Sequence, residues 1–279
     1  MIGSLQTGVS GLQQFQEDLQ VIGNNIANVN TVGYKSASMA FEDQLSQNLA
    51  NGSGNSMQIG EGVGTAAINS DFTQGAVNST GSTTDLAIQG NGFFLVTDTS
   101  SGQTYATRDG EFTCDKDGFL TNAAGFRVQG TMGASATVTD LQINSATAIA
   151  ALNDTATPAP TLEDGWTING SGQIIGTLTD GTTGVIGQIM LQDFTNPQAL
   201  VKQGGNVFSF SATAGPLAAP TAANTGGLGS IQSKALESSN VDLASQMASL
   251  ITAQRAFEAN AKIITTSDEV LQTLVNLKR

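Results

Sequence analysis

The chain has no histidine, a single cysteine (Cys114), and charged residues that make up only 12% of its 279 residues. Without histidine there is no Ser-His-Asp or Cys-His catalytic group, no histidine general base and no histidine-containing zinc site. Cys114 lies two residues after Phe112 in a predicted strand, which favours a packed small side chain. The carboxylates offer many pairs, but nothing singles one out. We therefore expect no enzyme activity, no catalytic residue and no bound metal or cofactor.

The few charges that are present are mostly negative. The net charge is −13, most of it between residues 36 and 234, and no Lys or Arg lies between Arg127 and Lys202. Such a surface repels phosphate backbones, so we expect no nucleic-acid partner. No stretch is apolar enough to span a membrane, and the N-terminus lacks the basic residue and apolar run of a secretory signal. We expect no membrane insertion, and export, if it occurs, without a cleaved leader.

The C-terminal residues 239–279 carry apolar residues at alternating steps of four and three, which predicts one long helix of about 37 residues that needs a partner. Ser239 with Asp242 approximates a capping box at its start. Gln254 and Asp268 interrupt the apolar positions, and they either set the register between subunits or face water in a lumen. We call the main apolar positions the C-terminal seam: Leu243, Met247, Leu250, Phe257, Ile264 and Leu271.

The N-terminus has the same spacing and predicts a second helix of about 25 residues, from Leu5 to Val29. Four glycines weaken it by roughly 1 kcal/mol each relative to alanine. Two ordinary amphipathic helices packed on a central core would also fit, but two narrow matched patterns at opposite ends favour a terminal coiled-coil pair. The N-terminal seam consists of Leu5, Leu12, Phe15, Leu19, Ile22 and Ile26.

Between the helices the sequence indicates short strands and turns. Residues 86–89 and 93–96 predict two strands of a hairpin joined by a tight turn at 90–92, and the following turns every eight to ten residues favour a small antiparallel sandwich or barrel. We expect a mixed, mainly β chain: antiparallel β-sandwich or barrel domains flanked by N- and C-terminal helices that pair as a coiled coil. The expected domains are a helical domain (1–35 with 236–279), a linker region (36–70) in which helical order persists to about residue 49, a core β domain (71–133 with 185–235) and a small outer β insertion (134–184).

Several stretches resemble the flagellar rod and hook protein family. LQVIGNNIANVNTVGYK (19–35) is similar to its N-terminal signature, and the stretch ALESSNVDL…LVNLKR (235–279) is similar to its C-terminal signature. TDLAIQGNGFF (84–94), TRDGEF (107–112) and residues 189–208 resemble its core β domain. The wording VDLASQM and ITTSDEVLQTLVNLKR is more like the axial hook protein, whereas the length and the small insertion are more like the distal rod protein.

The resemblance implies a structural subunit of the bacterial flagellar hook, which polymerises through its terminal helices into a hollow tube that serves as a flexible joint and export channel. A distal rod subunit of the basal body is the alternative within the family. It further implies a location in the flagellum, and as partners other copies of the chain, adjacent axial proteins (rod, hook cap and hook-filament junction) and the flagellar type III export apparatus. Phe41 with Leu45 is similar to a short export-gate element.

A different class of function is also compatible with the residues alone. A secreted β-rich adhesin or carbohydrate-active enzyme would have the same low charge, with its terminal helices in an ordinary bundle. Assembly of the concentrated protein into tubes would favour the structural subunit, and a polysaccharide activity lost with one carboxylate would favour the enzyme.

Overall fold

The computed structural model describes residues 2–44, 46–49, 57–133, 137–143, 162–178, 183–210, 213–216 and 219–277. The chain divides into two compact units, which we call the helical unit and the β unit. The helical unit contains Met1–Val29, Lys35–Asp71 and Val241–Arg279, and the β unit contains Asn30–Tyr34 and Phe72–Asn240.

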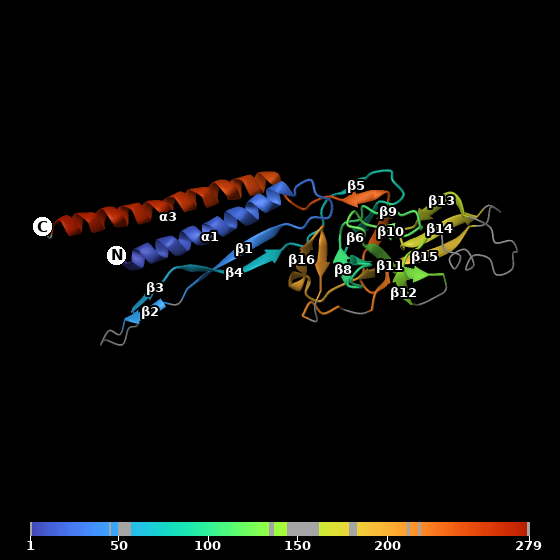
Figure 1. The fold of residues 1–279 in the computed structure, drawn as a ribbon, viewed down its shortest axis with the longest axis horizontal. Coiled ribbons are helices and arrows are strands. Elements are labelled where there is room, and N and C mark those ends of the chain that lie inside the picture. Colours follow the sequence, from blue (N-terminus) through green and yellow to red (C-terminus); the bar gives the residue numbers. More distant parts are fainter. Residues whose placement is uncertain are drawn as a thin grey trace. The chain divides into compact units, whose positions relative to one another are not determined.

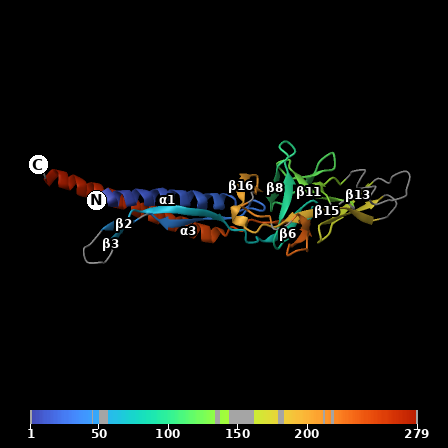
Figure 2. The same cartoon turned by 90° about the horizontal axis from the view of Figure 1, so that it is seen from below.

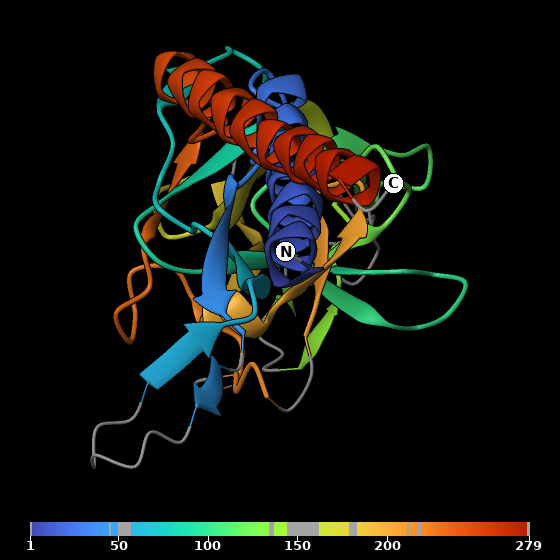
Figure 3. The ribbon, with the colours of Figure 1, turned by 90° about the vertical axis from the view of Figure 1, so that its left-hand side faces the viewer.

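The helical unit consists of two long helices and a ribbon of strands (Figure 1). The helices are α1 (Ile2–Ala27) and α3 (Leu243–Leu277). The strands are β1 (Ala37–Asp43), β2 (Ser46–Leu49), β3 (Met57–Gly60) and β4 (Val63–Ser70). β1 pairs antiparallel with β4, and β2 pairs antiparallel with β3. Seen along the helices, α3 and the β1–β4 ribbon lie on different sides of α1 (Figure 3).

Both terminal helices are confirmed, with one correction at the start of α3. The side chain of Asp242 accepts a hydrogen bond from the backbone N–H of Ala244 at 3.0 Å, and its carbonyl accepts one from Gln246 at 3.0 Å. Asp242 is therefore the N-cap residue itself, and not the third member of a box begun by Ser239. Its carboxylate also complements the positive end of the helix dipole.

Residues 36–70 differ from the expectation of a linker with helical order as far as residue 49. In the structure, residues 37–43 and 63–70 are extended and hydrogen-bonded to each other, with a register shift between Ala40 and Phe41. Ala37, Met39 and Phe41 recur at a spacing of two, with the smaller Ser38 and Ala40 between them, which suits a strand with one face on a helix.

The β unit is built around one large antiparallel sheet with the strand order β13-β14-β15-β11-β7-β8-β17-β16, to which β9, β10, β12 and β18 are added (Figure 2). Two further antiparallel pairs, β6 with β19 and β5 with β20, complete it. A short 3₁₀ helix, η1 (Pro197–Ala199), precedes β16. The strands are β5 (Val77–Ser79), β6 (Leu86–Gln89), β7 (Phe93–Thr97), β8 (Thr104–Thr107), β9 (Thr113–Cys114), β10 (Leu120–Thr121), β11 (Arg127–Met132), β12 (Val138–Asp140), β13 (Leu162–Ile168), β14 (Gln173–Leu178), β15 (Thr183–Gln192), β16 (Val201–Gly204), β17 (Val207–Ser209), β18 (Thr221–Ala222), β19 (Ser230–Ser233) and β20 (Ala235–Glu237).

The expected hairpin of residues 86–96 is wrong in its pairing, although both strands exist. β6 pairs with β19, whereas β7 pairs with β8, β11 and β15. The tight turn is replaced by two glycines with φ of 111° and 119°, Gly90 and Gly92, values that few residues other than glycine adopt. Gly229 lies against this segment, because a Cβ on it would come within 2.3 Å of the carbonyl oxygen of Gln89.

Two apolar clusters form the interior of the β unit. The larger cluster contains residues from many strands, among them Leu86 on β6, Phe94 on β7 and Ile189 on β15, all of which are almost fully buried. A second cluster gathers phenylalanines from distant segments, among them Phe93, Phe194 and Phe208. The prediction that Cys114 is a packed side chain is wrong. Cys114 is exposed at the end of β9, whereas Phe112 is buried.

Candidate assembly surface

The surface that carries both predicted seams is the antiparallel pair of α1 and α3. Asn25, near the end of α1, is hydrogen-bonded to Gln246, near the start of α3. Gly8, near the start of α1, lies against Ile264 in the second half of α3. The two helices therefore run in opposite directions side by side, as Figures 1 and 2 show.

Two glycines of α1 allow the helices to approach closely. A Cβ on Gly8 would lie 3.1 Å from the side chain of Ile264, and a Cβ on Gly11 would lie 2.8 Å from the side-chain nitrogen of Asn260. By contrast, a Cβ on Gly3 or Gly23 would meet nothing within 4 Å. All four glycines were expected only to weaken the helix, but Gly8 and Gly11 also allow its close packing on α3.

Asn25 joins three elements of the helical unit. Its side chain donates to the carbonyl of Ala37 at 2.7 Å and accepts from the N–H of Ala37 at 3.0 Å, which fixes the start of β1. It also donates to the side chain of Gln246 at 3.3 Å on α3. Asn25 is 1% exposed, so each of these bonds is largely shielded from water. The apolar periodicity gave no indication of this role, because Asn25 lies among other asparagines in NNIAN.

The β1–β4 ribbon covers the other side of α1 through polar and aromatic contacts. The Ser10 hydroxyl accepts a hydrogen bond from the N–H of Val63 at 3.4 Å, and the Thr65 hydroxyl contacts Gln14 and Glu17. Phe41 on β1 packs on Phe15 of α1, with 5.5 Å between ring centroids. These contacts add to the cover that α3 provides for α1.

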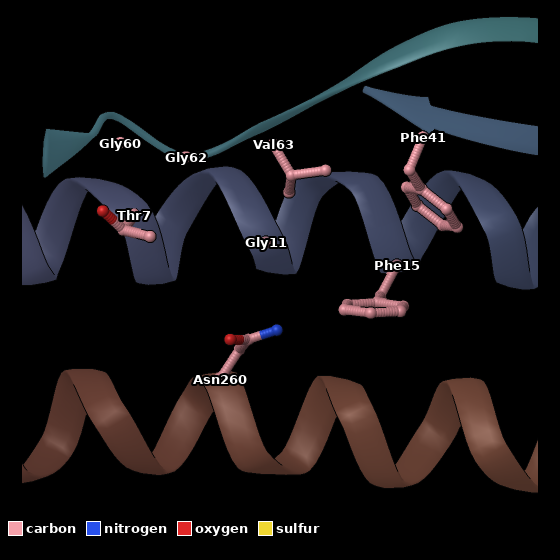
Figure 4. A pocket seen from close by; sticks show the side chains of 8 residues that line it. All are labelled: Thr7, Gly11, Phe15, Phe41, Gly60, Gly62, Val63 and Asn260. Carbon is pink, nitrogen blue, oxygen red and sulfur yellow. The ribbon is translucent and has the colours of Figure 1, made fainter. Parts of the chain in front are cut away.

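A pocket of about 530 Å³ opens beside these contacts, lined by residues of α1, α3 and the ribbon. Figure 4 shows Asn260 reaching from α3 towards α1, with the Phe15 ring beside it and Phe41 on the ribbon side. Its lining residues are Thr7, Gly11, Phe15, Phe41, Gly60, Gly62, Val63 and Asn260. None of them is titratable, so the pocket offers no acid-base chemistry.

The N-terminal seam lies on the covered surface of α1. Ile22 is buried, and Leu5, Leu12, Phe15, Leu19 and Ile26 are partly buried. The spacing of three and four thus selects the side of α1 that faces the rest of the helical unit. The candidate export-gate element consists of Phe41 and Leu45. Phe41 lies in strand β1 and not in a helix, where residues four apart would share a face, and Leu45 lies outside the described residues.

The C-terminal seam divides into a covered and an exposed part. Leu250, Phe257, Ile264 and Leu271 are partly buried, whereas Leu243 and Met247 are exposed. The side of α3 that meets α1 combines Ile264 with small and polar residues such as Ala253 and Asn260. Gln254 and Asp268, the candidates for setting register, are exposed.

The second half of α3 presents an apolar stripe that stays largely exposed, although its first member, Ile263, lies near Gly8 of α1. Ile263, Val270, Leu274 and Leu277, which we call the C-terminal stripe, follow one another at steps of seven, four and three and are 44–78% exposed. The same heptad positions further back are Ala253, which is buried, and Asn260, which meets α1. The C-terminal stripe is therefore the uncovered continuation of the α1–α3 interface.

Charge contributes little to this surface. Arg255 and Glu258 form an ion pair of 3.0 Å in which both side chains are largely exposed, so its contribution to stability is small. Burial raises the pKa of Asp18 on α1. In the described part of the chain no group of three or more His, Cys, Asp or Glu residues could hold a metal, and no helix combines the length and hydropathy needed to cross a bilayer.

Comparisons with known proteins match the terminal helices and the β unit to one family. Residues 5–35 match the model of the flagella basal body rod protein, residues 87–151 that of the flagellar hook protein FlgE/F/G D1 domain, and residues 232–277 that of the flagellar basal body rod FlgEFG protein C-terminal region. The flagellar basal-body rod protein FlgG of Bacillus subtilis is 40% identical over 287 residues, covering 100% of both chains. The chain belongs to the flagellar rod and hook protein family.

Other members of the family match along the whole chain as well. FlgG of Caulobacter vibrioides is 33% identical over 287 residues and covers 99% of both chains. The flagellar hook protein FlgE of Escherichia coli is 28% identical over an alignment of 407 residues, covering 97% of this chain and 98% of its own. A crystal structure of the Helicobacter pylori flagellar hook protein FlgE2 covers 58% of this chain and 100% of its own, with a TM-score of 0.43 and 10% identity.

The family predicted from the sequence is thus confirmed. Its members are structural components of the flagellum, and no catalytic residue emerges from the comparisons. They give no support to the alternative of a secreted adhesin or carbohydrate-active enzyme.

Proposed function

We propose that this chain is a structural subunit of the flagellar basal-body rod that polymerises through its terminal helices into a hollow axial tube. The choice of rod over hook is supported by chain length. The FlgG relatives align over 287 residues, close to the length of this chain, whereas the alignments with FlgE extend over 407 and 446 residues because those proteins contain additional segments. The hook remains the second candidate, because the wording of residues 241–247 and 264–279 resembles the hook protein.

The observation that carries the polymer is the uncovered C-terminal stripe. Its four side chains are about half exposed or more. Burying the exposed half of such a side chain contributes roughly 1 kcal/mol, so the stripe supplies about 4 kcal/mol of gross association energy per subunit, to which Leu243, Met247 and Ile251 add on the first half of α3. A surface with this drive and few charges fits a second copy of the chain.

We further propose that the terminal helices form a coiled-coil inner tube, that residues 72–240 lie outside it, and that the chain is exported by the flagellar type III apparatus to join adjacent axial proteins. In the isolated monomer the exposed helix positions lack cover, and a helix with an uncovered apolar stripe is marginal in water. We expect the helix content measured by circular dichroism to be lower in dilute monomer than in the polymer.

The test is a matched pair of charge substitutions. Leu274→Asp places a carboxylate in the C-terminal stripe and should abolish tubes in negative-stain images of the concentrated protein. Val201→Asp changes a similarly exposed valine on the β unit and should leave them intact. Normal tubes from Leu274→Asp would refute assembly through this stripe.

A further inference from the structure

The segment that follows α1, Asn30–Tyr34, belongs to the β unit and is held there in the manner of a bound peptide. The N–H of Gly33 donates to the carbonyl of Glu237 at 2.8 Å, and the carbonyl of Val32 accepts from the side chain of Asn206 at 2.8 Å. Tyr34 is buried, and the Lys202 ammonium lies 4.8 Å from the centre of its ring. Backbone hydrogen bonds and one buried aromatic ring are typical elements of peptide recognition.

Only glycine fits at the centre of this segment. Gly33 has a φ of 66°, a left-handed conformation that side chains disfavour. A Cβ at this position would lie 2.6 Å from the backbone nitrogen of Asp109 and 2.7 Å from the carbonyl carbon of Arg108. Because both neighbours are backbone atoms, they cannot move aside as a flexible side chain can.

The walls of the site are fixed by a buried ion pair. Arg108 and Glu237 are 4% and 0% exposed, and their charged groups are 3.3 Å apart. The second carboxylate oxygen of Glu237 accepts from the N–H of Gly75 at 2.9 Å, and Arg108 donates to the carbonyl of Gly90 at 2.9 Å. The pair thus ties together four segments that are distant in sequence.

We propose that the β unit carries a binding site for residues 30–34 of its own chain, and that this anchor joins the chain just after α1 to the chain just before α3 so that the two helices pair. Gly33 is bonded to Glu237, and along the chain from there towards the helices the two ends next meet at Asn25 and Gln246. The anchor is a property of the single subunit, so it does not depend on the proposed assembly.

The magnitude follows from loop closure. With the anchor in place, pairing Asn25 with Gln246 closes a loop of about 17 residues. Without it, the next connection between the two ends is the pair of bonds from the Asn240 side chain to Thr73, and the loop grows to about 54 residues. Since closure probability falls as roughly the three-halves power of loop length, helix pairing should weaken about sixfold.

Hydrogen exchange of the soluble monomer, read by mass spectrometry, tests the site directly. Residues 30–34 should be protected as strongly as the β unit. Exchange of these residues as fast as in an unfolded chain would overturn the proposal.

Two glycine variants test the consequence. Gly33→Ala should remove the protection of residues 30–34 and lower the protection of α1 and α3 about sixfold. Gly102→Ala, at a φ of 67° with nothing within 4 Å, imposes the same backbone strain without the clash and should leave both unchanged. Asn206→Gly is the second variant, to be used if Gly33→Ala unfolds the β unit. Glycine suits the φ of 57° at this position, so the change removes only the bond to Val32, and it should also lower the protection of α1 and α3. Unchanged protection of the helices in a variant that has lost the anchor would overturn the proposal.

Discussion

Replacing Asn25 with alanine removes the side chain that joins α1, α3 and β1. The N–H and carbonyl of Ala37 and the side-chain carbonyl of Gln246, all in partly buried positions, would each lose a partner at 2.7–3.3 Å. Leaving one buried polar group unsatisfied costs about 1–3 kcal/mol. Water and small shifts will satisfy some of the three groups, so we expect the α1–α3–β1 arrangement to lose about 2–4 kcal/mol of stability. At 1.4 kcal/mol per factor of ten, the critical concentration for assembly should rise by about 30-fold or more.

The assay is sedimentation of polymer from a concentration series, with the supernatant giving the critical concentration. Asn24→Ala is the matched control, because Asn24 is exposed and its side chain accepts a local hydrogen bond from Asn28 at 3.0 Å. It should shift the critical concentration less than threefold. If Asn25→Ala assembles at the wild-type concentration, Asn25 does not join the three elements in the polymer.

Three further changes have defined outcomes. Gly23→Ala should raise the helix melting temperature measured by circular dichroism, because alanine is favoured over glycine by about 1 kcal/mol in an open helix position. Gly11→Ala should lower it, because the new Cβ would lie 2.8 Å from Asn260 on α3. Equal shifts for the two variants would contradict the close packing. Arg108→Met leaves the Glu237 carboxylate buried without its cation and should destabilise the β unit by about 3–5 kcal/mol, measured by denaturant unfolding with fluorescence of the single tryptophan. Burial, together with nearby carboxylates, raises the pKa of Asp109 to about 6. The contribution of Asp109 to stability is therefore fully present below its unfolded pKa of about 4 and is lost as pH rises through 6. Asp109→Asn should remove this pH dependence from unfolding curves measured at pH 4 to 7, and an unchanged dependence would refute it.

The terminal helices were predictable because their apolar residues repeat over many turns and no proline interrupts them. The covered side of α1 followed from the same spacing. The side of α3 that meets α1 followed only in part, through Ile264, because it also contains Ala253 and Asn260, which an apolar pattern does not select. Their small size and the facing glycines matter only once the two helices are placed together.

The strands of the β unit were easier to predict than their partners. Residues 86–89 and 93–96 both form strands, yet each pairs with residues distant in sequence, which no local turn pattern encodes. The anchor of residues 30–34 is not predictable from the sequence for the same reason. Gly33 reads as a helix terminator, and its requirement for a missing Cβ arises from Arg108 and Asp109, which only the folded chain brings beside it.

The measurement that tests the central claim most directly is a cryo-electron microscopy reconstruction of the assembled protein. We expect a hollow tube in which a second copy covers Val270, Leu274 and Leu277 on α3. A tube whose subunits meet through the β units alone, with these three side chains facing solvent, would contradict assembly through the terminal helices.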